Sequence, residues 1–233
     1  MQYVKVTILQ TDRCGSGDVD AALTVLSAEE LDRYRKFHFA EDRRDYALAH
    51  ALLRRTLNLL EPATDAQSWQ FDADGTGKPR ISGRPNLDFS LTHARGLVAC
   101  AVTNAGQVGI DAETEQRAVD VDLLAGEVCS PSEQRALAGM AARGRTARFL
   151  DFWTLKEAFL KATGIGVATD LAAVGFGIGT DDRITADFPP NLRQPSFSFR
   201  LCRTGTGGRI ALAVSGDLQA QDAEMTRVAR WDE

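Results

Sequence analysis

The sequence predicts an α+β fold of two similar α/β halves packed together, because three kinds of element recur in the same order about half a chain apart. The first is a capping box, in which a serine three residues before a glutamate satisfies free amides at a helix start, at 27–30 and again at 130–133. The others are a long helical stretch and an apolar strand after a turn. They are 42–60 and 96–102 in the first half, and 148–163 and 209–214 in the second. We therefore expect pseudo-repeat halves 1–106 and 107–233, with a site in the cleft between them.

Apolar alternation and β-branched content predict the strands. They are expected at 3–9, 68–71, 87–91, 97–102, 107–113, 174–178, 196–202 and 209–215. Glycine-rich segments at 72–77 and 204–208 predict turns, the second of them a hairpin loop. The polar, acidic stretch from Asp217 predicts a frayed tail.

Composition and charge narrow the class of protein. Of 233 residues, 44% are hydrophobic and 25% are charged, close to the globular average. A net charge of −5 argues against bulk attraction to nucleic acid or to an anionic membrane. The four cysteines form no C-x-x-C pair and no apolar run reaches the roughly 18 residues of a membrane span, so we expect a reduced, cytoplasmic protein.

Two acidic side chains on one predicted strand form the first candidate site. A strand period of two places Asp111 and Glu113 on the same face of segment 108–113, where a cation should lie near them. Oxygen ligands of this kind suit Mg²⁺. Two solvated acids at a strand end would give the same pattern, so the motif alone is weak.

The helix predicted at 148–163 is the second candidate, because apolar residues surround its whole circumference and predict burial. Glu157 and Lys161 are one turn apart on the face of Trp153, where a charge is costly unless a partner, a metal or an anionic ligand compensates it. An ordinary Glu–Lys pair, with lysines that reach solvent, is the alternative.

Three weaker features could contact phosphate. The turn 75–79 offers glycines and Lys78, although it does not fit the P-loop pattern and is typical of a plain turn. His93 ends a strand beside a hydroxyl, which suits a phosphate donor or a structural histidine equally well. Segment 33–55 is rich in arginine within an acidic chain, which fits a phosphate-rich ligand, an acidic partner or a solvated helix face.

Taken in chain order, five motifs resemble those of the surfactin-type phosphopantetheinyl transferases. They are Arg35-Lys36-Phe37 with Asp42 and Arg44, Gly77-Lys78-Pro79, Phe89-Ser90-Leu91-Thr92-His93, Gly109-Ile110-Asp111-Ala112-Glu113, and the helix from Trp153 to Gly164. The resemblance spans 27–170 and implies two pseudo-symmetric α/β halves with coenzyme A bound in the cleft. Thr92 stands where the family usually has serine, and Glu30 and Asp45 stand near positions where relatives often carry basic residues.

The resemblance implies transfer of phosphopantetheine from coenzyme A to a serine of an apo acyl, peptidyl or aryl carrier protein, with release of adenosine 3′,5′-bisphosphate. It implies Mg²⁺, or Mn²⁺, held by Asp111, Glu113 and Glu157. Glu157 or a metal-bound water would be the base, Lys161 would stabilise the leaving phosphate and Lys156 would assist. The implied coenzyme A contacts are Arg35, Lys36, Arg44, Gly77, Lys78, Pro79, Thr92, His93, Asp111, Lys156 and Lys161.

Two other functions compete with this one. A Mg²⁺-dependent phosphohydrolase of nucleotide pyrophosphates could use the same carboxylates and lysines. A coenzyme A-binding or carrier-docking module without chemistry is the non-enzymatic alternative, and the presence of both the acidic residues and Lys161 argues against it. Because both halves of the site lie in one chain, we expect a monomer. Carrier proteins of fatty acid, polyketide, nonribosomal peptide or siderophore synthesis remain equally open as substrates.

Overall fold

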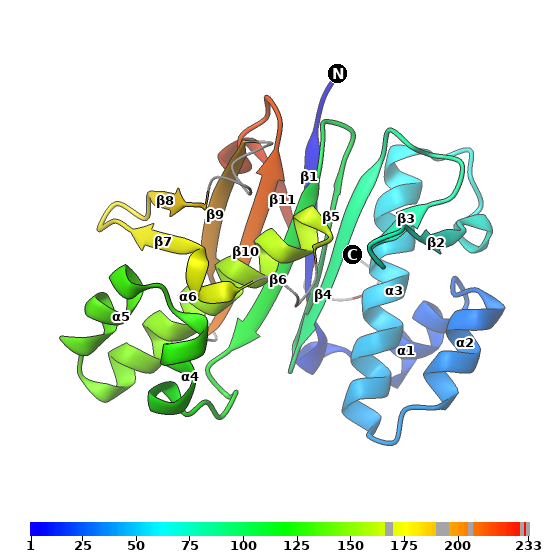
Figure 1. Ribbon diagram of the computed structural model, residues 1–233. Coiled ribbons are helices and arrows are strands. Elements are labelled where there is room, and N and C mark those ends of the chain that lie inside the picture. The colour runs from blue at the N-terminus through cyan, green and yellow to red at the C-terminus, as the bar shows by residue number, and fades with distance from the viewer. Residues whose placement is uncertain (166–169, 190–195, 205–206, 229–230, 232–233) are drawn as a thin grey trace.

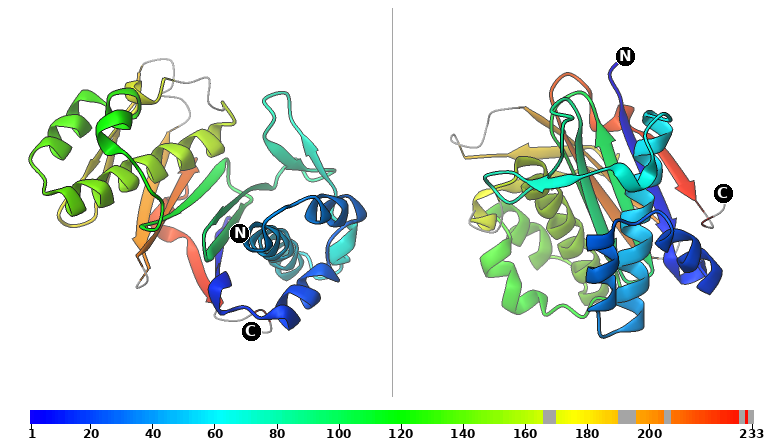
Figure 2. Two further views of the ribbon diagram at one scale, coloured as in Figure 1. Left: turned by 90° about the horizontal axis from the view of Figure 1, so that it is seen from below. Right: turned by 90° about the vertical axis from the view of Figure 1, so that its right-hand side faces the viewer.

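The computed structural model describes residues 1–165, 170–189, 196–204, 207–228 and 231. It has two lobes, each with helices packed on a sheet, and the sheets lie between the two sets of helices (Figures 1 and 2). The predicted α+β fold of two similar halves is confirmed. No helix within the described ranges is long and apolar enough to cross a membrane.

The two halves follow the same path. The first contains β1 (Val4–Gln10), η1 (Thr11–Arg13), α1 (Ser16–Leu23), α2 (Ala28–Arg35), α3 (Ala40–Leu60), η2 (Ala66–Ser68), β2 (Phe71–Ala73), β3 (Pro79–Ile81), β4 (Asp88–Ala94) and β5 (Leu97–Thr103). The second contains β6 (Val108–Thr114), α4 (Val121–Val128), α5 (Pro131–Ala138), α6 (Ala142–Thr163), η4 (Leu171–Ala173), β7 (Gly175–Ile178), β8 (Ile184–Asp187), β9 (Phe197–Arg203), β10 (Gly208–Ser215), η6 (Ala220–Asp222) and β11 (Glu224–Val228).

Strand pairing repeats between the halves. In the first half β1 pairs with β5 and β5 with β4, all antiparallel, and β2 and β3 form a separate hairpin. In the second half β6 pairs with β10 and β10 with β9, and β7 and β8 form the corresponding hairpin. The last strand, β11, leaves its own half and adds to the first sheet, parallel to β1 (Figure 1). The division at 106/107 therefore remains a proposal, because one strand crosses it.

Both predicted capping boxes form. The Ser27 hydroxyl accepts from the amide of Glu30, whose carboxylate accepts from the Ser27 amide, and Ser130 and Glu133 do the same. Each glutamate is buried at the start of its helix. A buried carboxylate needs a partner, and the long helix of each half provides one.

The partners are Arg54 on α3 and Lys156 on α6. Arg54 Nε lies 2.8 Å from Glu30 Oε2, and Lys156 Nζ lies 2.9 Å from Glu133 Oε2. Each cation also donates to a carbonyl of the following 3-10 turn, Arg54 to Ala66 at 2.6 Å and Lys156 to Leu171 at 2.8 Å. The two halves thus share a buried Glu–cation–carbonyl connection that holds helix, helix and turn together.

The core forms three apolar layers. One lies between α3 and the first sheet, and one between α6 and the second sheet. The third, which includes Val6, Ile110 and Ile210, lies between the two sheets. β1 and β6 each direct one apolar face into this third layer, with Val4, Val6 and Ile8 from β1 and Val108, Ile110 and Ala112 from β6. The other face of β6 carries Gly109, Asp111 and Glu113.

Two predicted elements are wrong. Residues 68–71, predicted as a strand, instead end the turn η2 and enter β2, because the Trp69 ring is buried and its Nε1 donates to Asn58 at 2.8 Å. The stretch after Asp217, predicted to fray, contains η6 and the paired strand β11, whose polar residues face solvent at the sheet edge. Residues 205–206 of the predicted hairpin loop lie outside the described residues.

Candidate active site

The two sheets meet where β4 lies against β6, a junction that we call the seam. The two strands belong to separate sheets, and side chains connect them. Asp88, Ser90 and Thr92 of β4 accept hydrogen bonds from alternate backbone amides of β6 at 2.8, 3.0 and 3.1 Å. A strand period of two directs all three side chains to the same side, so their oxygens take the place of backbone carbonyls.

Helix α6 packs directly on β6. A Cβ atom at Gly109 would lie 1.9 Å from the carbonyl oxygen of Ala158 and 2.4 Å from the amide of Ala162, so only glycine allows this approach. The contact brings one face of α6, with Glu157 and Lys161, to the strand that carries Asp111.

Lys78 connects the seam to α6. Its Nζ lies 2.6 Å from Asp88 Oδ2 and donates to the carbonyls of Val108 at 3.0 Å and Ala162 at 3.1 Å. Burial lowers the pKa of Lys78, and the nearby charge of Asp88 opposes that shift. All three ammonium protons therefore have acceptors, and the second Asp88 oxygen accepts from Arg80 at 2.5 Å.

Asp111 is the centre of the site. Its Oδ1 accepts from Lys161 Nζ at 2.7 Å and from the Thr92 hydroxyl at 3.2 Å, while Oδ2 is buried and has no hydrogen-bond partner among the residues that the structure describes. Burial raises the pKa of Asp111 against the attraction of Lys161. Burial, and then the charge of Asp111, raise the pKa of Glu157. The two carboxylates therefore share too little positive charge.

Glu113 is engaged elsewhere. Its carboxylate pairs with Arg117, whose guanidinium carbon lies 4.6 Å from the centre of the Trp153 ring. Within the described part of the chain, no three His, Cys, Asp or Glu side chains are gathered as a metal-binding group. The structure thus brings Asp111 and Glu157 together and leaves Glu113 beside them on its own cation.

A cavity of about 320 Å³ opens beside the seam, lined by residues of the β2–β3 turn, β4 and α6. They are Thr76, Gly77, Lys78, Pro79, Phe89, Ser90, Leu91, Glu157, Leu160, Lys161 and Gly164. A second cavity, of about 400 Å³, shares Pro79, Phe89 and Leu91 and continues between α2, α3 and β2, where Arg33 and His50 line it. We call the two together the groove.

The structure places other predicted residues outside the groove. Arg35 is exposed and pairs with Asp32 at 2.6 Å, and Lys36 is exposed at the end of α2. Arg44 lines a smaller cavity of about 200 Å³ at the junction of the halves. Lys156 is 1% exposed and held by Glu133 and by backbone carbonyls.

Thr92 and His93 lie on β4 beside the groove. The Thr92 hydroxyl accepts from the Ala112 amide and donates to Asp111, and its predicted contact with coenzyme A stays a prediction. Burial lowers the pKa of His93, with the charge of Asp45 opposing. Lys161 pairs with Asp111, not with Glu157 as the ordinary helix pair would require.

Sequence reasoning missed part of the lining. No role was predicted for Ser90, Phe89 or Leu160, yet Ser90 holds the seam together and Phe89 and Leu160 line the groove. Arg33, which also lines it, belongs to the arginine-rich segment 33–55 that the sequence indicated. The sequence pattern could have indicated the seam. Oxygen-bearing side chains recur with a period of two at positions 88, 90 and 92, and the residues between them are apolar.

Comparisons with known proteins indicate the family to which the chain is similar. The family model described as the 4′-phosphopantetheinyl transferase superfamily matches residues 107–214, which include Asp111, Glu113, Glu157 and Lys161. The 4′-phosphopantetheinyl transferase HetI of Nostoc sp. is 36% identical over 152 residues. The chain is therefore similar to members of the 4′-phosphopantetheinyl transferase superfamily, most clearly in its second half. The matched region runs from β6 to β10, so the superfamily match covers the half that carries the carboxylates.

Coverage differs among similar proteins of the superfamily. The match to HetI covers 64% of this chain and 63% of that relative, so the chain spans less than two thirds of its length. A 4′-phosphopantetheinyl transferase of Bacillus subtilis is 26% identical, with 78% of this chain and 79% of the relative covered. Among solved structures, the holo-acyl-carrier-protein synthase of Thermotoga maritima matches with 22% identity and a TM-score of 0.42, over 49% of this chain and 65% of that one.

Proposed function

We propose that this protein transfers 4′-phosphopantetheine from coenzyme A to a serine hydroxyl of an apo carrier protein, with Mg²⁺. The single observation that carries the proposal is the buried Oδ2 of Asp111, which lacks a hydrogen-bond partner among the described residues and lies beside Glu157 and Lys161 at the groove. The names of the relatives supply the reaction, and the geometry supplies a site that suits it.

A divalent cation fits these residues. Asp111 has an orphaned carboxylate oxygen, and burial, followed by the charge of Asp111, raises the pKa of Glu157, so the site gains from positive charge. Asp111 and Glu157 would hold the ion, and Glu113 would join them after Arg117 releases it. When bound, Mg²⁺ neutralises charge on the pyrophosphate and orients it.

The groove suits an elongated substrate such as coenzyme A. Its two cavities, of about 320 and 400 Å³, adjoin at Pro79, Phe89 and Leu91, which line both. Arg33 at the far end offers a cation for phosphate, and Lys161 offers one at the near end. We place the pyrophosphate near Lys161 and the adenosine end toward α2.

Each residue has a defined task in the transfer. The carrier serine oxygen forms a bond to the β-phosphorus as the bond from that phosphorus to the bridging oxygen breaks. The serine proton goes to the Glu157 carboxylate, which lines the groove beside Lys161. The bridging oxygen leaves on adenosine 3′,5′-bisphosphate, whose charge Lys161 stabilises.

Lys78 and Lys156, predicted to contact coenzyme A, have their ammonium groups bound to carboxylates and carbonyls. We propose that both act by position, Lys78 by fixing the seam against α6 and Lys156 by fixing α5 against α6. Neither ammonium retains a free proton for phosphate unless these contacts break.

Intact-mass spectrometry tests the function. Purified apo carrier proteins are incubated with this chain, coenzyme A and Mg²⁺, with a chelator in a parallel reaction. We expect a chelator-sensitive gain of one phosphopantetheine. Glu157→Gln should lower the rate at least about 100-fold, as loss of a general base does, whereas Glu127→Gln, on the exposed face of α4, should not.

Other outcomes would contradict the proposal. Cleavage of coenzyme A without any carrier protein would establish a phosphohydrolase. Binding of coenzyme A without turnover on any carrier would establish a binding module. Transfer that persists in Glu157→Gln would remove Glu157 from the site.

A further inference from the structure

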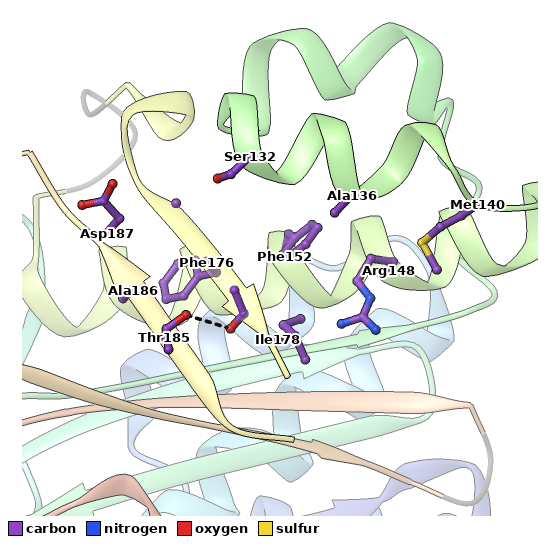
Figure 3. Close-up of a pocket in the computed structure, with 12 residues that line it drawn as sticks. Ser132, Ala136, Met140, Arg148, Phe152, Phe176, Ile178, Thr185, Ala186 and Asp187 are labelled. Carbon is purple, nitrogen blue, oxygen red and sulfur yellow. Dashed lines mark hydrogen bonds between the residues drawn. The ribbon is translucent and has the colours of Figure 1, made fainter. Parts of the chain in front are cut away.

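The C-terminal half contains a cavity of about 740 Å³ that the proposed function does not use. It lies between α5, α6 and the β7–β8 hairpin, and it shares no lining residue with the groove (Figure 3). Its volume is within the range of pockets that bind small molecules.

This cavity is the counterpart of the far end of the groove. That end lies between α2, α3 and the β2–β3 hairpin, which correspond to α5, α6 and β7–β8. The buried cations Arg54 and Lys156 occupy equivalent positions, so α3 and α6 can be aligned residue by residue on them. On α3, the first cavity is lined by Tyr46, two turns before Arg54, and by His50, one turn before it. The positions two turns and one turn before Lys156 on α6 are Arg148 and Phe152, and both line the second cavity.

The floor of this cavity is apolar. Figure 3 shows Phe152 and Phe176 on one side of the space and Ile178 below them, with Met140 at one end. Phe152 and Phe176 are buried members of the C-terminal core, so their ring positions are fixed by packing. An apolar body would therefore find a preformed surface here.

One cation faces this floor. Arg148 is half-buried on α6, and it has no hydrogen bond or ion pair with any residue of the described ranges. Its neighbour Arg145, by contrast, pairs with Asp122. Figure 3 shows the Arg148 guanidinium between Met140 and Ile178, at the opposite end from Asp187. An unpaired guanidinium beside an apolar floor attracts an anion.

We propose that this cavity binds a small amphipathic monoanion, a carboxylate on an aliphatic or aromatic body. The carboxylate would pair with Arg148, and the body would lie on Phe152, Phe176 and Ile178. The site is separate from the groove, so the proposal does not depend on the transferase reaction.

Isothermal titration calorimetry of the full chain tests this, with 4-phenylbutyrate and octanoate as probes and 4-phenylbutyramide as the uncharged match. We expect saturable binding of at least one acid, and at least tenfold weaker binding of the amide, because a charge-assisted pair is lost. Arg148→Met should weaken the acid at least tenfold, while Arg135→Met, exposed on α5 outside the cavity, should not.

Two further arms locate the site. Ala136→Trp would fill the cavity from the exposed face of α5 and should abolish binding. Saturating coenzyme A should leave the acid affinity unchanged, because the groove is elsewhere. No binding of either acid, equal binding of acid and amide, unchanged affinity in Arg148→Met, or displacement by coenzyme A would overturn the proposal. Thermal unfolding of each variant confirms that it is folded.

Discussion

Two buried glutamates each stabilise several elements of the fold at once. Glu30 and Glu133 each complete a capping box, bind a cation on the next helix and fix the helix start. Burial alone would raise the pKa of Glu30, but hydrogen bonds with His50, the Ser27 amide and Arg54 outweigh burial and lower it to about 2. The stability of the fold should therefore depend on the charge of this carboxylate.

Acid unfolding tests the Glu30 connection. Its pKa is 4.5 ordinarily and about 2 in the folded protein, so the ionised group stabilises the fold above pH 4.5. That contribution, about 3 kcal/mol at roughly 1.4 kcal/mol per pKa unit, is lost as the pH falls toward 2. Glu30→Gln should lower the free energy of unfolding at pH 7 by a similar amount and flatten its dependence below pH 4.5. Chemical denaturation at several pH values measures both. An unchanged slope would show that Glu30 is not the group responsible.

The two lysines of α6 should separate structure from catalysis. Lys156→Met leaves Glu133 buried without its cation, so we expect a loss of about 3–5 kcal/mol of stability. Lys161→Met removes the half-exposed cation of the groove, so transfer should fall. The loss of stability should be smaller than in Lys156→Met, because Asp111 keeps the Thr92 hydroxyl and its raised pKa lets it take up a proton. Calorimetry measures the stability of the two variants, and the rate of carrier modification measures their transfer activity on the same preparations. A Lys156→Met protein of normal stability without transfer would assign Lys156 to catalysis.

At the scale of elements, the seam is a contact that sequence periodicity could have indicated. Ser90→Ala would leave the Ile110 amide without its acceptor, at a cost of about 1–3 kcal/mol. Hydrogen exchange should show faster exchange at Ile110 than at other β6 amides. Ser16→Ala, at an exposed position on α1, serves as the control. Equal protection of Ile110 in both variants would mean that the seam does not depend on the Ser90 hydroxyl.

Elements with strong local patterns were predictable, and those that depend on distant partners were not. The capping boxes and the apolar strands such as 97–102 were found within a residue or two, because their signals are local. The strand β11 is polar and was missed, because it forms only where β1 offers an open edge. The site followed the same rule. Strand and helix periodicity singled out Asp111, Glu157 and Lys161, and the structure brings them together, whereas the binding of Lys156 to Glu133 could not be predicted without the fold.

At the scale of the whole molecule, β11 ties the halves a second time. The chain leaves the second sheet and β11 pairs along β1, where Oε1 of Glu224 lies 3.3 Å from Nζ of Lys5. Nearby, the guanidinium carbon of Arg55 lies 4.6 Å from the centre of the Trp231 ring. The halves are therefore held together both at the seam and by the returning strand.

Removal of the returning strand tests this second connection. We expect the full chain to be a monomer of 25.3 kDa by light scattering, because β11 covers the edge of β1. A chain that stops at Gly216 should melt at a lower temperature and self-associate through the uncovered edge. Lys5→Gln, which removes only the ion pair, should remain monomeric. A truncated chain that stays monomeric with an unchanged melting temperature would contradict this.

The chemistry of the seam is uneven between its two sides. The first half contributes side chains to the seam, namely Lys78, Asp88, Ser90 and Thr92. Their hydrogen-bond partners in the second half are mostly peptide groups of β6 and α6. Peptide groups are the same in every sequence, so the seam itself requires few particular side chains of the second half besides Gly109 and Asp111. The apolar layer between the sheets and the pairing of β11 with β1 set the remaining requirements. Recombination between genes of distant relatives should therefore yield working hybrids when the first half is kept whole, and laboratory shuffling has a natural crossover point between β5 and β6.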